Sequence, residues 1–268
     1  STCGCNTGYT IRPAIANSNW GGITTTSCGA PSQTLTVTFY YIPPPPCTTP
    51  TAQPTGLSFS STLFTINGSF AAASPAADNY LVVMTTSSVA PTAPTDGVTY
   101  TAGANALGGK ILSAGTSTSF SATGLSDNTP YWFWVYAYNS NSCTGGPAYR
   151  TTSPLTATAT TAACSLSGTR TVGPTGTYPT IAAAITAINT AGLGGDLALE
   201  LQPGYTGESY PITIGQLTCA SASRRLTIRP QTTMTVTASA STAMIDLNGG
   251  DYVTLDGRVG STGSTKAL

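Results

Sequence analysis

Leu125-Ser-Asp-Asn-Thr-Pro-Tyr-Trp-Phe-Trp-Val-Tyr-Ala-Tyr-Asn139 is the densest aromatic run of a chain that is otherwise rich in Thr and Ala. From Tyr131 onward its side chains alternate between two faces, with Phe133 on the face of Tyr131 and with Trp132 and Trp134 on the other. A period of two over this length predicts a β-strand with two distinct faces. The Asp-Asn-Thr-Pro before it has the chemistry of a turn, which sets where the strand begins. A strand so rich in aromatic residues is typical of the centre of a β-sandwich sheet.

The composition excludes several classes of function. Only 7% of the 268 residues are charged and the formal net charge is zero, so the basic patch of a nucleic-acid-binding protein is absent from the sequence. No apolar run reaches about 18 residues, so we expect no membrane insertion. The sequence has no histidine, which excludes a Ser-His-Asp triad, a Cys-His dyad and a His-ligated metal within these residues. We therefore expect no catalytic residue, no cofactor and no metal, in a chain that is not an enzyme; this expectation does not extend beyond Leu268.

Seven cysteines indicate disulfide chemistry. No pair has the Cys-x-x-Cys spacing and no histidine is present to complete a zinc site, so disulfides in an oxidising, extracellular setting are the better interpretation. Because the count is odd, one thiol is free or has its partner outside these residues. The pairing of Cys3, Cys5 and Cys28 stays open.

The N-terminal part divides into a small module and a linker. Residues 1–42 contain one clear strand pattern and Gly-rich turns, which is little material for a full core. We expect either a partial β-sandwich or a small disulfide-stapled module. Residues 43–53 are a Pro-rich linker that opens with a four-proline run at 43–46. This run is expected to be extended and to act as a stiff spacer, or as a ligand for a proline-recognising domain.

One set of positions around the aromatic strand fits a known pattern: Leu125, Thr129, Tyr131, Phe133, Val135, Ala137 and Asn139. In this order they resemble the E–F corner and F strand of a fibronectin type III domain. The resemblance implies a tyrosine corner, in which the hydroxyl of Tyr131 bonds back to the backbone of the E–F connection, and it gives Leu125 a structural role. It implies a β-sandwich of seven short strands over 54–161. The strands are expected at 57–60, 63–70, 79–86, 110–113, 118–123, 131–138 and 148–160.

The same resemblance implies a disulfide. In fibronectin type III domains the loop after the F strand lies at the pole where the chain enters. Cys143 falls in that loop and Cys47 lies just before the first strand. We therefore expect a Cys47–Cys143 disulfide that closes almost the whole domain.

The period of the sequence changes after a second linker at 162–178. Ile181, Ala184, Ile185 and Ile188 recur at i, i+3, i+4 and i+7, which predicts an amphipathic helix. Thr180 can cap its start and Gly192 its end. Short strands with turn pairs between them are expected at 197–201, 212–214, 226–228, 234–237, 244–247 and 252–255.

Residues 169–268 resemble the start of a right-handed parallel β-helix of the pectate-lyase-like superfamily, and we expect this domain, with its capping helix, at 179–268. The resemblance is carried by Tyr178-Pro-Thr-Ile and by Leu201-Gln-Pro-Gly-Tyr205 with Glu208. It implies that the helix, with Pro179, Ile181 and Ile185, caps the open end of the coil. It also implies a Cys164–Cys219 disulfide as a staple across the cap. Since a β-helix needs several rungs and a second cap, we expect the chain to be a fragment.

Three late aspartates are the first candidates for a site. They are Asp246, Asp251 and Asp256. Polysaccharide lyases on β-helices use carboxylates to hold calcium and a basic residue to abstract a proton, so a lyase here would need Asp246 or Asp251 with Arg258 on one groove. Asn-Gly-Gly-Asp and Asp-Gly are also ordinary turn sequences, in which Asp bonds its own backbone, and we favour that role.

Other candidates have simpler explanations. Trp132 and Trp134 can form an aromatic platform for a glycan, or they can pack within the sandwich. Asn67-Gly-Ser69 is a formal N-glycosylation sequon. Arg224 and Arg225 form a small basic spot on a turn, which we expect to be solvated.

Taken together, the modules resemble the very large secreted surface proteins of Bacteroidota, and the segments 47–55 and 143–155 resemble that group's module borders. The resemblance implies an extracellular location on the bacterial cell surface, export by type IX secretion, and a non-enzymatic structural or adhesive role, as in gliding adhesins or filaments. Implied partners are cell-surface or glycan ligands, neighbouring modules or copies of the chain, and the secretion machinery during export. Two alternatives stay open: a polysaccharide-degrading β-helix enzyme with accessory modules, and an extracellular fibre subunit assembled by strand donation.

Overall fold

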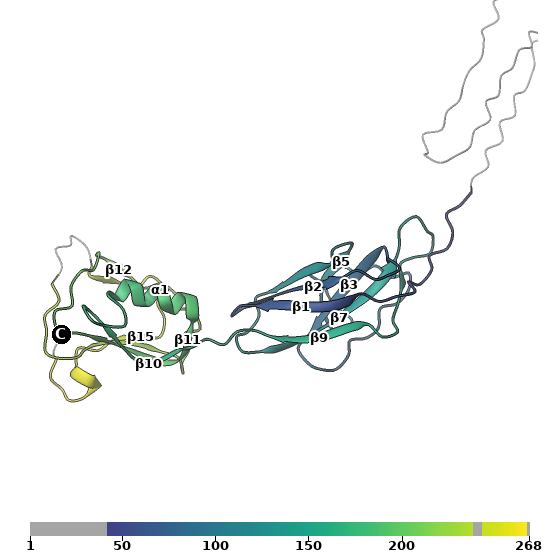
Figure 1. Ribbon diagram of the computed structural model, residues 1–268. Coiled ribbons are helices and arrows are strands. Elements are labelled where there is room, and N and C mark those ends of the chain that lie inside the picture. Colours follow the sequence, from purple (N-terminus) through teal and green to yellow (C-terminus); the bar gives the residue numbers. More distant parts are fainter. Residues whose placement is uncertain (1–41, 238–242, 267–268) are drawn as a thin grey trace, which may run out of the picture. The chain divides into compact units, whose positions relative to one another are not determined.

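The computed structural model describes residues 42–237 and 243–266 (Figure 1). The module expected at 1–42, with Cys3, Cys5 and Cys28, lies outside these residues apart from Ile42. The described chain is mainly β and contains a β-sandwich followed by a unit built on parallel strands.

Two antiparallel sheets form the sandwich. One sheet has the order β1-β2-β6, and the other has the order β4-β5-β3-β7-β8, with β9 also paired to β7. The aromatic strand β7 is central in the larger sheet, as its composition predicts. The two sheets form the β-sandwich that the sequence predicts, and the expected last strand at 148–160 is split into two. The strands are β1 (Thr55–Ser61), β2 (Thr65–Ala71), β3 (Asn79–Thr85), β4 (Asn105–Ala106), β5 (Gly109–Gly115), β6 (Ser119–Thr123), β7 (Pro130–Asn139), β8 (Ala148–Tyr149) and β9 (Leu155–Thr160).

The core of the sandwich lies between the two sheets. Phe133 from β7 is fully buried there, with ring centroids 4.8 Å from Phe59 and 5.4 Å from Phe120. Phe120 lies directly over Gly68 of β2, so that a Cβ at this glycine would overlap the phenyl ring. The central aromatic cluster therefore requires a residue without a side chain at this position of the adjacent strand, β2.

The second face of β7 is buried as well. Trp134 and Tyr136 join Leu81, Val83 and Ile111 in a separate cluster on the outer side of the larger sheet. The chain between β3 and β5 covers this cluster, because Tyr100 and Leu107 pack against it. Both faces of β7 therefore pack against apolar side chains, which explains why aromatic residues occupy both faces.

The segment expected as a free linker at 43–53 belongs in part to the sandwich. The amide of Gln53 donates to the carbonyl of Arg150 over 2.7 Å and accepts from the N–H of Ala137 over 3.0 Å. The side chain of Asn139 donates to the carbonyl of Thr48. The linker interpretation is therefore wrong for these residues, whose polar groups are bonded to β7 and to the chain after β8.

Parallel strands build the C-terminal unit. The sheet order β10-β11-β13-β15 is parallel throughout, and β12 and β14 form a separate parallel pair. Residues 168, 197, 226 and 253 are paired across the four strands, so the chain returns to the same place after 29, 29 and 27 residues. This repeat is compatible with stacked rungs. The elements are β10 (Leu166–Val172), α1 (Ile181–Ala191), β11 (Leu193–Leu201), β12 (Ile212–Thr213), β13 (Leu226–Pro230), β14 (Ile245–Asp246), β15 (Val253–Leu255) and the 3-10 turn η1 (Val259–Ser261).

Two expectations for this unit are wrong. The linker at 162–178 contains β10, whose last residue Val172 is fully buried in the core of the unit. Between Leu166 and Val172 every residue of β10 is polar or glycine, so no alternating pattern marks this strand in the sequence. Residues 234–237 form no strand, although they alternate as a strand would.

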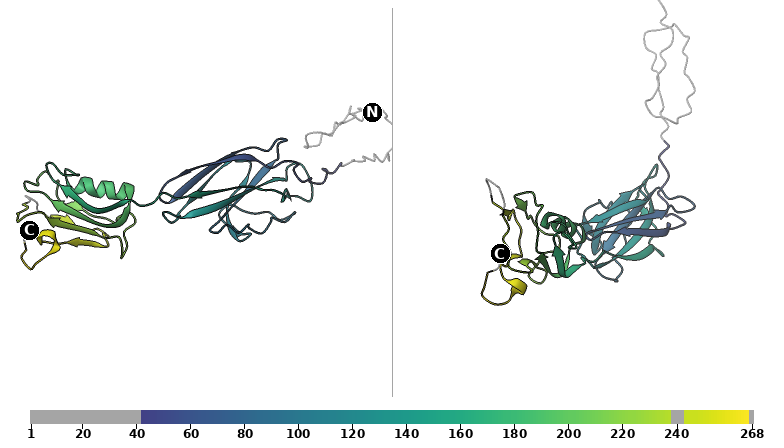
Figure 2. Two further views of the ribbon diagram at one scale, coloured as in Figure 1. Left: turned by 60° about the horizontal axis from the view of Figure 1, so that its bottom comes forward. Right: turned by 60° about the vertical axis from the view of Figure 1, so that its left-hand side comes forward.

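The helix α1 begins and ends where its caps predict. The Thr180 hydroxyl accepts from the N–H of Ala183 over 3.1 Å, and Gly192 adopts φ +70° directly after the last turn. Ile181 and Ile185 are buried on the face that packs against the strands, while Pro179 is exposed before the cap. Figures 1 and 2 show α1 lying along one side of the parallel strands.

Candidate functional site

The three late aspartates do not converge. Asp256 binds Arg258 through two contacts, Nε to Oδ1 at 2.8 Å and Nη2 to Oδ2 at 2.9 Å, and it also accepts from the N–H of Arg258. These bonds from Arg258 hold the pKa of the Asp256 carboxyl well below its ordinary value. Asp246 on β14 and Asp251 before β15 are exposed. The arrangement is that of a turn held by its own aspartate, and Arg258 is occupied by Asp256.

The proposed aromatic platform is not formed. Trp134 is only 6% exposed and belongs to the cluster on the outer side of the larger sheet. Trp132 is half-buried and packs against the same cluster. A sugar ring needs the open face of an aromatic side chain, so the interpretation as a glycan platform is wrong for Trp134.

The exposed face of the sheet β1-β2-β6 carries hydroxyl and amide groups. Asn67 of the sequon lies in its centre, on a strand that is paired on both sides. The face forms an open hollow of about 650 Å³, and Ser58 Oγ lies 3.1 Å from Ser69 Oγ within it. Two rows cross the three strands in register: Ser58, Ser69 and Ser119 form one, and Ser60, Asn67 and Ser121 form the other.

The tyrosine corner is present and fixes the turn before β7. The Tyr131 hydroxyl accepts from the N–H of Ser126 over 3.0 Å. The hydroxyl of Thr161, which is 3% exposed, donates to the carbonyl of Ser126 and accepts from the N–H of Thr129. The carbonyl of Ala162 accepts from the N–H of Asn128. The turn is therefore bonded both to β7 and to the chain that leaves β9.

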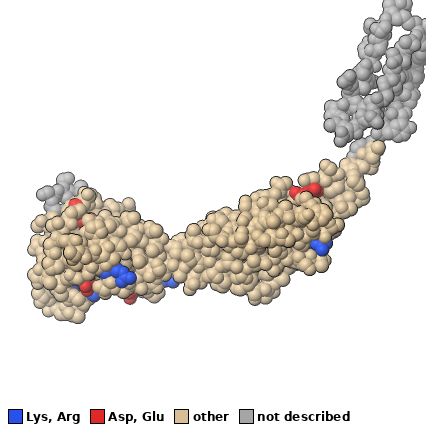
Figure 3. Space-filling model, in the orientation of Figure 1, with Lys and Arg blue, Asp and Glu red and all other residues tan. Residues whose placement is uncertain are grey.

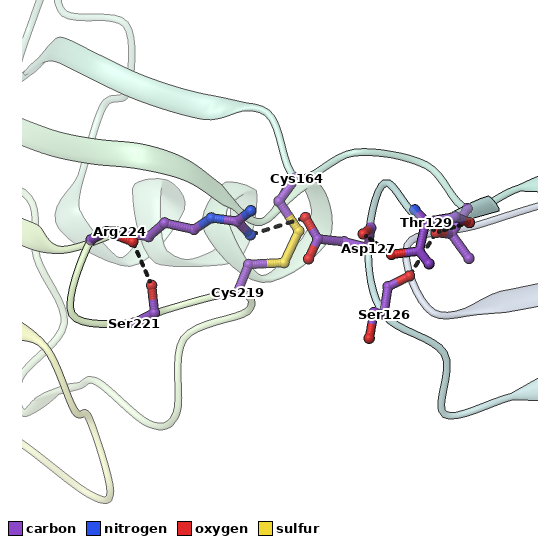
Figure 4. Close-up of polar contacts among 9 residues, drawn as sticks. Ser126, Asp127, Thr129, Cys164, Cys219, Ser221 and Arg224 are labelled. Atoms are coloured by element: carbon purple, nitrogen blue, oxygen red, sulfur yellow. Dashed lines mark hydrogen bonds and ion pairs between the residues drawn. A yellow bond between two sulfur atoms is a disulfide. The ribbon is translucent and has the colours of Figure 1, made fainter. Parts of the chain in front are cut away.

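The same turn presents Asp127 to the parallel-strand unit. Asp127 Oδ2 and Arg224 Nη1 are 2.9 Å apart, and the disulfide of Cys164 and Cys219 lies beside them (Figure 4). Arg224 is held in a tight turn by reciprocal backbone bonds with Ser221. The sequence did not predict this ion pair, and Arg224 was expected to be solvated. Its only sequence signal is a charged residue in the turn before β7, which does not identify a partner 97 residues away.

Within the described part of the chain, one group of three potential metal ligands comes together: Asp127, Cys164 and Cys219. Their ligand atoms lie within 4.8 Å of one another, but both sulfur atoms are joined in the disulfide. A thiolate is the form of cysteine that binds metal, so the oxidised pair offers no such ligand. The group therefore combines a disulfide between Cys164 and Cys219 with the Asp127–Arg224 ion pair, and only the ion pair joins the turn before β7 to the parallel-strand unit.

The second disulfide lies at the other border of the sandwich. Cys47 and Cys143 are bonded, with their Cα atoms 4.8 Å apart, as the fibronectin resemblance implies. Thr144 pairs in parallel with the proline run, accepting from the N–H of Cys47 and donating to the carbonyl of Pro45, each over 2.9 Å. The loop after β7 therefore holds the incoming chain by one covalent bond and two hydrogen bonds.

Glu208 caps the start of α1. Its Oε1 accepts from the N–H of Ile181 and from the hydroxyl of Tyr205. Burial, together with the hydrogen bond to Glu208, raises the pKa of the Tyr205 hydroxyl. A carboxylate at a helix N-terminus is stabilised by the unpaired N–H groups there. Glu208 therefore has a structural role. Its position three residues after Tyr205 is the sequence signal for this contact.

No protein-family model and no curated protein matches the chain. The solved structures with a similar fold include fibronectin type III domains. FN3tt is 20% identical, with 42% of this chain and 97% of that chain covered and a TM-score of 0.28. A domain of human fibronectin type III domain containing protein 3 is 18% identical, with 41% and 84% covered and a TM-score of 0.27. A domain of human collagen XX is 18% identical, with 42% and 97% covered and a TM-score of 0.25.

The surface drawn in Figure 3 carries few charged side chains. No helix among the residues described is long and apolar enough to span a membrane. The two disulfides are consistent with an oxidising, extracellular location.

Proposed function

We propose that this chain is part of a non-enzymatic structural and adhesive protein on a bacterial cell surface, exported by type IX secretion. In this proposal the fibronectin type III-like domain is a spacer and contact module. The parallel-strand unit is the start of a right-handed β-helix whose open end is capped by α1. The residue spacings of 29, 29 and 27 between paired strands support the coil.

The observation that carries the proposal is the position of the two disulfides. One joins the chain entering the sandwich to the loop after β7, and the other fixes the start of the parallel-strand unit. Disulfides persist outside the cytosol, where small modules depend on them. Covalent bonds at module borders suit a protein whose work is to hold its modules together in an extracellular environment.

The exposed face of β1-β2-β6 supports a role as a contact surface. Its serine hydroxyls and the Asn67 amide can both donate and accept hydrogen bonds, as the hydroxyls of a glycan do. The face carries no charged side chain, so it does not select for a charged ligand. We therefore propose a neutral, hydroxyl-rich ligand such as a surface glycan for this face.

Labelling of cells tests the location. An antibody against the chain is expected to label intact cells of the encoding bacterium, and a deletion strain is expected to attach less well to surfaces. Labelling that appears only after the cells are permeabilised would refute an extracellular role. Release of oligosaccharide products by the purified protein would favour the enzyme alternative instead.

Variants test the contact face. Ser58→Glu with Ser69→Glu places two charges in the hollow and is expected to reduce attachment. Thr156→Glu with Thr158→Glu is the matched control, because these residues are exposed on β9 of the other sheet. Equal attachment by both double variants would show that the β1-β2-β6 face is not the contact surface.

A further inference from the structure

The two disulfides enclose long loops of the chain. Cys47 and Cys143 are 96 residues apart in sequence but have Cα atoms 4.8 Å apart. Cys164 and Cys219 are 55 residues apart with Cα atoms 6.5 Å apart. Each disulfide therefore connects directly two residues that are otherwise connected only through a long stretch of backbone.

The first loop contains most of the sandwich. The strands from β1 to β7 all lie between Cys47 and Cys143, while β8 and β9 follow Cys143. Tension on the chain before Cys47 passes through the disulfide to Cys143 and then into β9. The hydrogen bonds of Thr144 with the backbone of Pro45 and Cys47 run beside this bond. The strands inside the loop are bypassed, because their two ends are already joined.

The second loop has the same effect in the next unit. It contains β10, α1, β11 and β12, and tension that arrives at Cys164 leaves at Cys219. Gly192, which ends α1, lies so close to the disulfide that a Cβ there would meet both sulfur atoms. The helix and the first strands are thus packed against the bond and excluded from the load.

Part of the segment between the two bonds is already extended. From Cys47 to Cys219, tension passes only through residues 143–164. Within this segment β9 is already an extended strand, paired with β7 from Leu155↔Val135 to Thr160↔Pro130. An extended strand gains almost no length when it is pulled. The proline run at 43–46, before the first bond, is stiff for its own reason.

From this topology we infer that the chain is a tension-bearing link. Its disulfides carry a pulling force from module to module and keep strands β1 to β7 and the capping helix out of the load path, which runs through β8 and β9. A disulfide that served stability alone could join any two core strands; here each bond joins a border segment to a later loop. The inference rests on the proposed surface role only for the source of the force.

The length held back by each bond follows from chain geometry. An extended chain spans about 3.3–3.6 Å per residue, so the Cys47–Cys143 bond withholds about 320–350 Å and the Cys164–Cys219 bond about 180–200 Å. Together they withhold about 500–550 Å. These lengths are large compared with a folded module, so single-molecule force spectroscopy can resolve them.

The experiment pulls the full chain between marker domains that are attached through peptide tags. The reference is the variant Cys3→Ser, Cys5→Ser, Cys28→Ser, in which the cysteines at 47, 143, 164 and 219 are retained. With dithiothreitol the total contour-length gain is expected to exceed that of the oxidised chain by about 500–550 Å. Equal gains in the two redox states would overturn the inference.

Paired variants assign each share of the length. Cys47→Ser with Cys143→Ser is expected to regain about 320–350 Å in the oxidised state, and Cys164→Ser with Cys219→Ser about 180–200 Å. If a pair does not fold, the redox comparison in the reference still decides. Peptide mapping without reduction must also find both bonds, and any other pairing would refute the load path. None of these results depends on where the protein is located, so they are separable from the labelling of cells.

Discussion

The tyrosine corner gives a direct test of how the turn before β7 is held. Replacing Tyr131 by Phe removes one hydroxyl and leaves the ring in the core, where the residue is 5% exposed. The N–H of Ser126 then loses its partner at 3.0 Å. A net hydrogen bond contributes about 0.5–1.5 kcal/mol, and an unpaired donor costs about 1–3 kcal/mol when it is fully buried. Ser126 is exposed, so water can reach the vacated N–H. We therefore expect Tyr131→Phe to lower the free energy of unfolding by about 0.5–1.5 kcal/mol, the net value of the lost hydrogen bond.

Urea unfolding followed by tryptophan fluorescence measures this loss. Trp132 and Trp134 are next to the substitution, and a Trp20→Phe background makes them the only tryptophans. The matched control is Tyr138→Phe on the same strand, where burial raises the pKa of the hydroxyl but no hydrogen bond to another described residue is formed. The control is expected to stay within about 0.5 kcal/mol of the parent. A loss below about 0.5 kcal/mol for Tyr131→Phe, or an equal loss in both variants, would show that the corner bond does not stabilise the fold.

Three further predictions concern single contacts. Gly68→Ala should destabilise the sandwich by about 1–3 kcal/mol in the same urea assay, because its Cβ overlaps Phe120, whereas Gly215→Ala, with ordinary contact at 3.6 Å, should be close to neutral. Asp256→Asn should lower the thermal midpoint at neutral pH. Since the folded-state pKa of Asp256 is depressed, its stabilising contribution is present above the ordinary pKa of about 3.9 and is lost as pH falls; a gap between variant and parent that stayed constant down to pH 2 would contradict this. A double-mutant cycle of Asp127→Ala and Arg224→Ala should give a coupling below about 1 kcal/mol, because both side chains are partly exposed. A coupling of several kcal/mol would show that this pair is far better shielded from solvent than its exposure indicates.

The sequence was sufficient where local pattern and burial agree. Strict alternation from Tyr131 placed β7, and the i, i+3, i+4, i+7 spacing placed α1 with Thr180 and Gly192 at its ends. Both disulfides follow from the resemblances, because a family pattern fixes which loops meet at one pole. In each case the signal comes from residues whose apolar character or backbone preference is compatible with only one local structure.

It was not sufficient where polar groups connect distant segments. Gln53 bonds to β7 and to the chain after β8, and Asp127 meets Arg224, yet neither residue carries a local signal that names its partner. β10 was missed because its exposed face is polar and only Val172 is fully buried. Trp134 was assigned two roles because alternation shows that a residue lies on the second face of a strand, but not what covers that face.

Most of the few acidic side chains of this chain have structural contacts. Seven of the nine acidic residues accept a hydrogen bond or form an ion pair that holds a turn, a helix end or two distant segments. Asp78, for example, accepts from the N–H groups of Ser140 and Asn141, which fixes the loop that leads to Cys143. A carboxylate that accepts such bonds is held in place by the segments that it joins. The two others, Asp246 and Asp251, are exposed and lie on or next to short strands. Most acids among the described residues therefore have an identified structural contact. The seven are Asp78, Asp96, Asp127, Asp196, Glu200, Glu208 and Asp256.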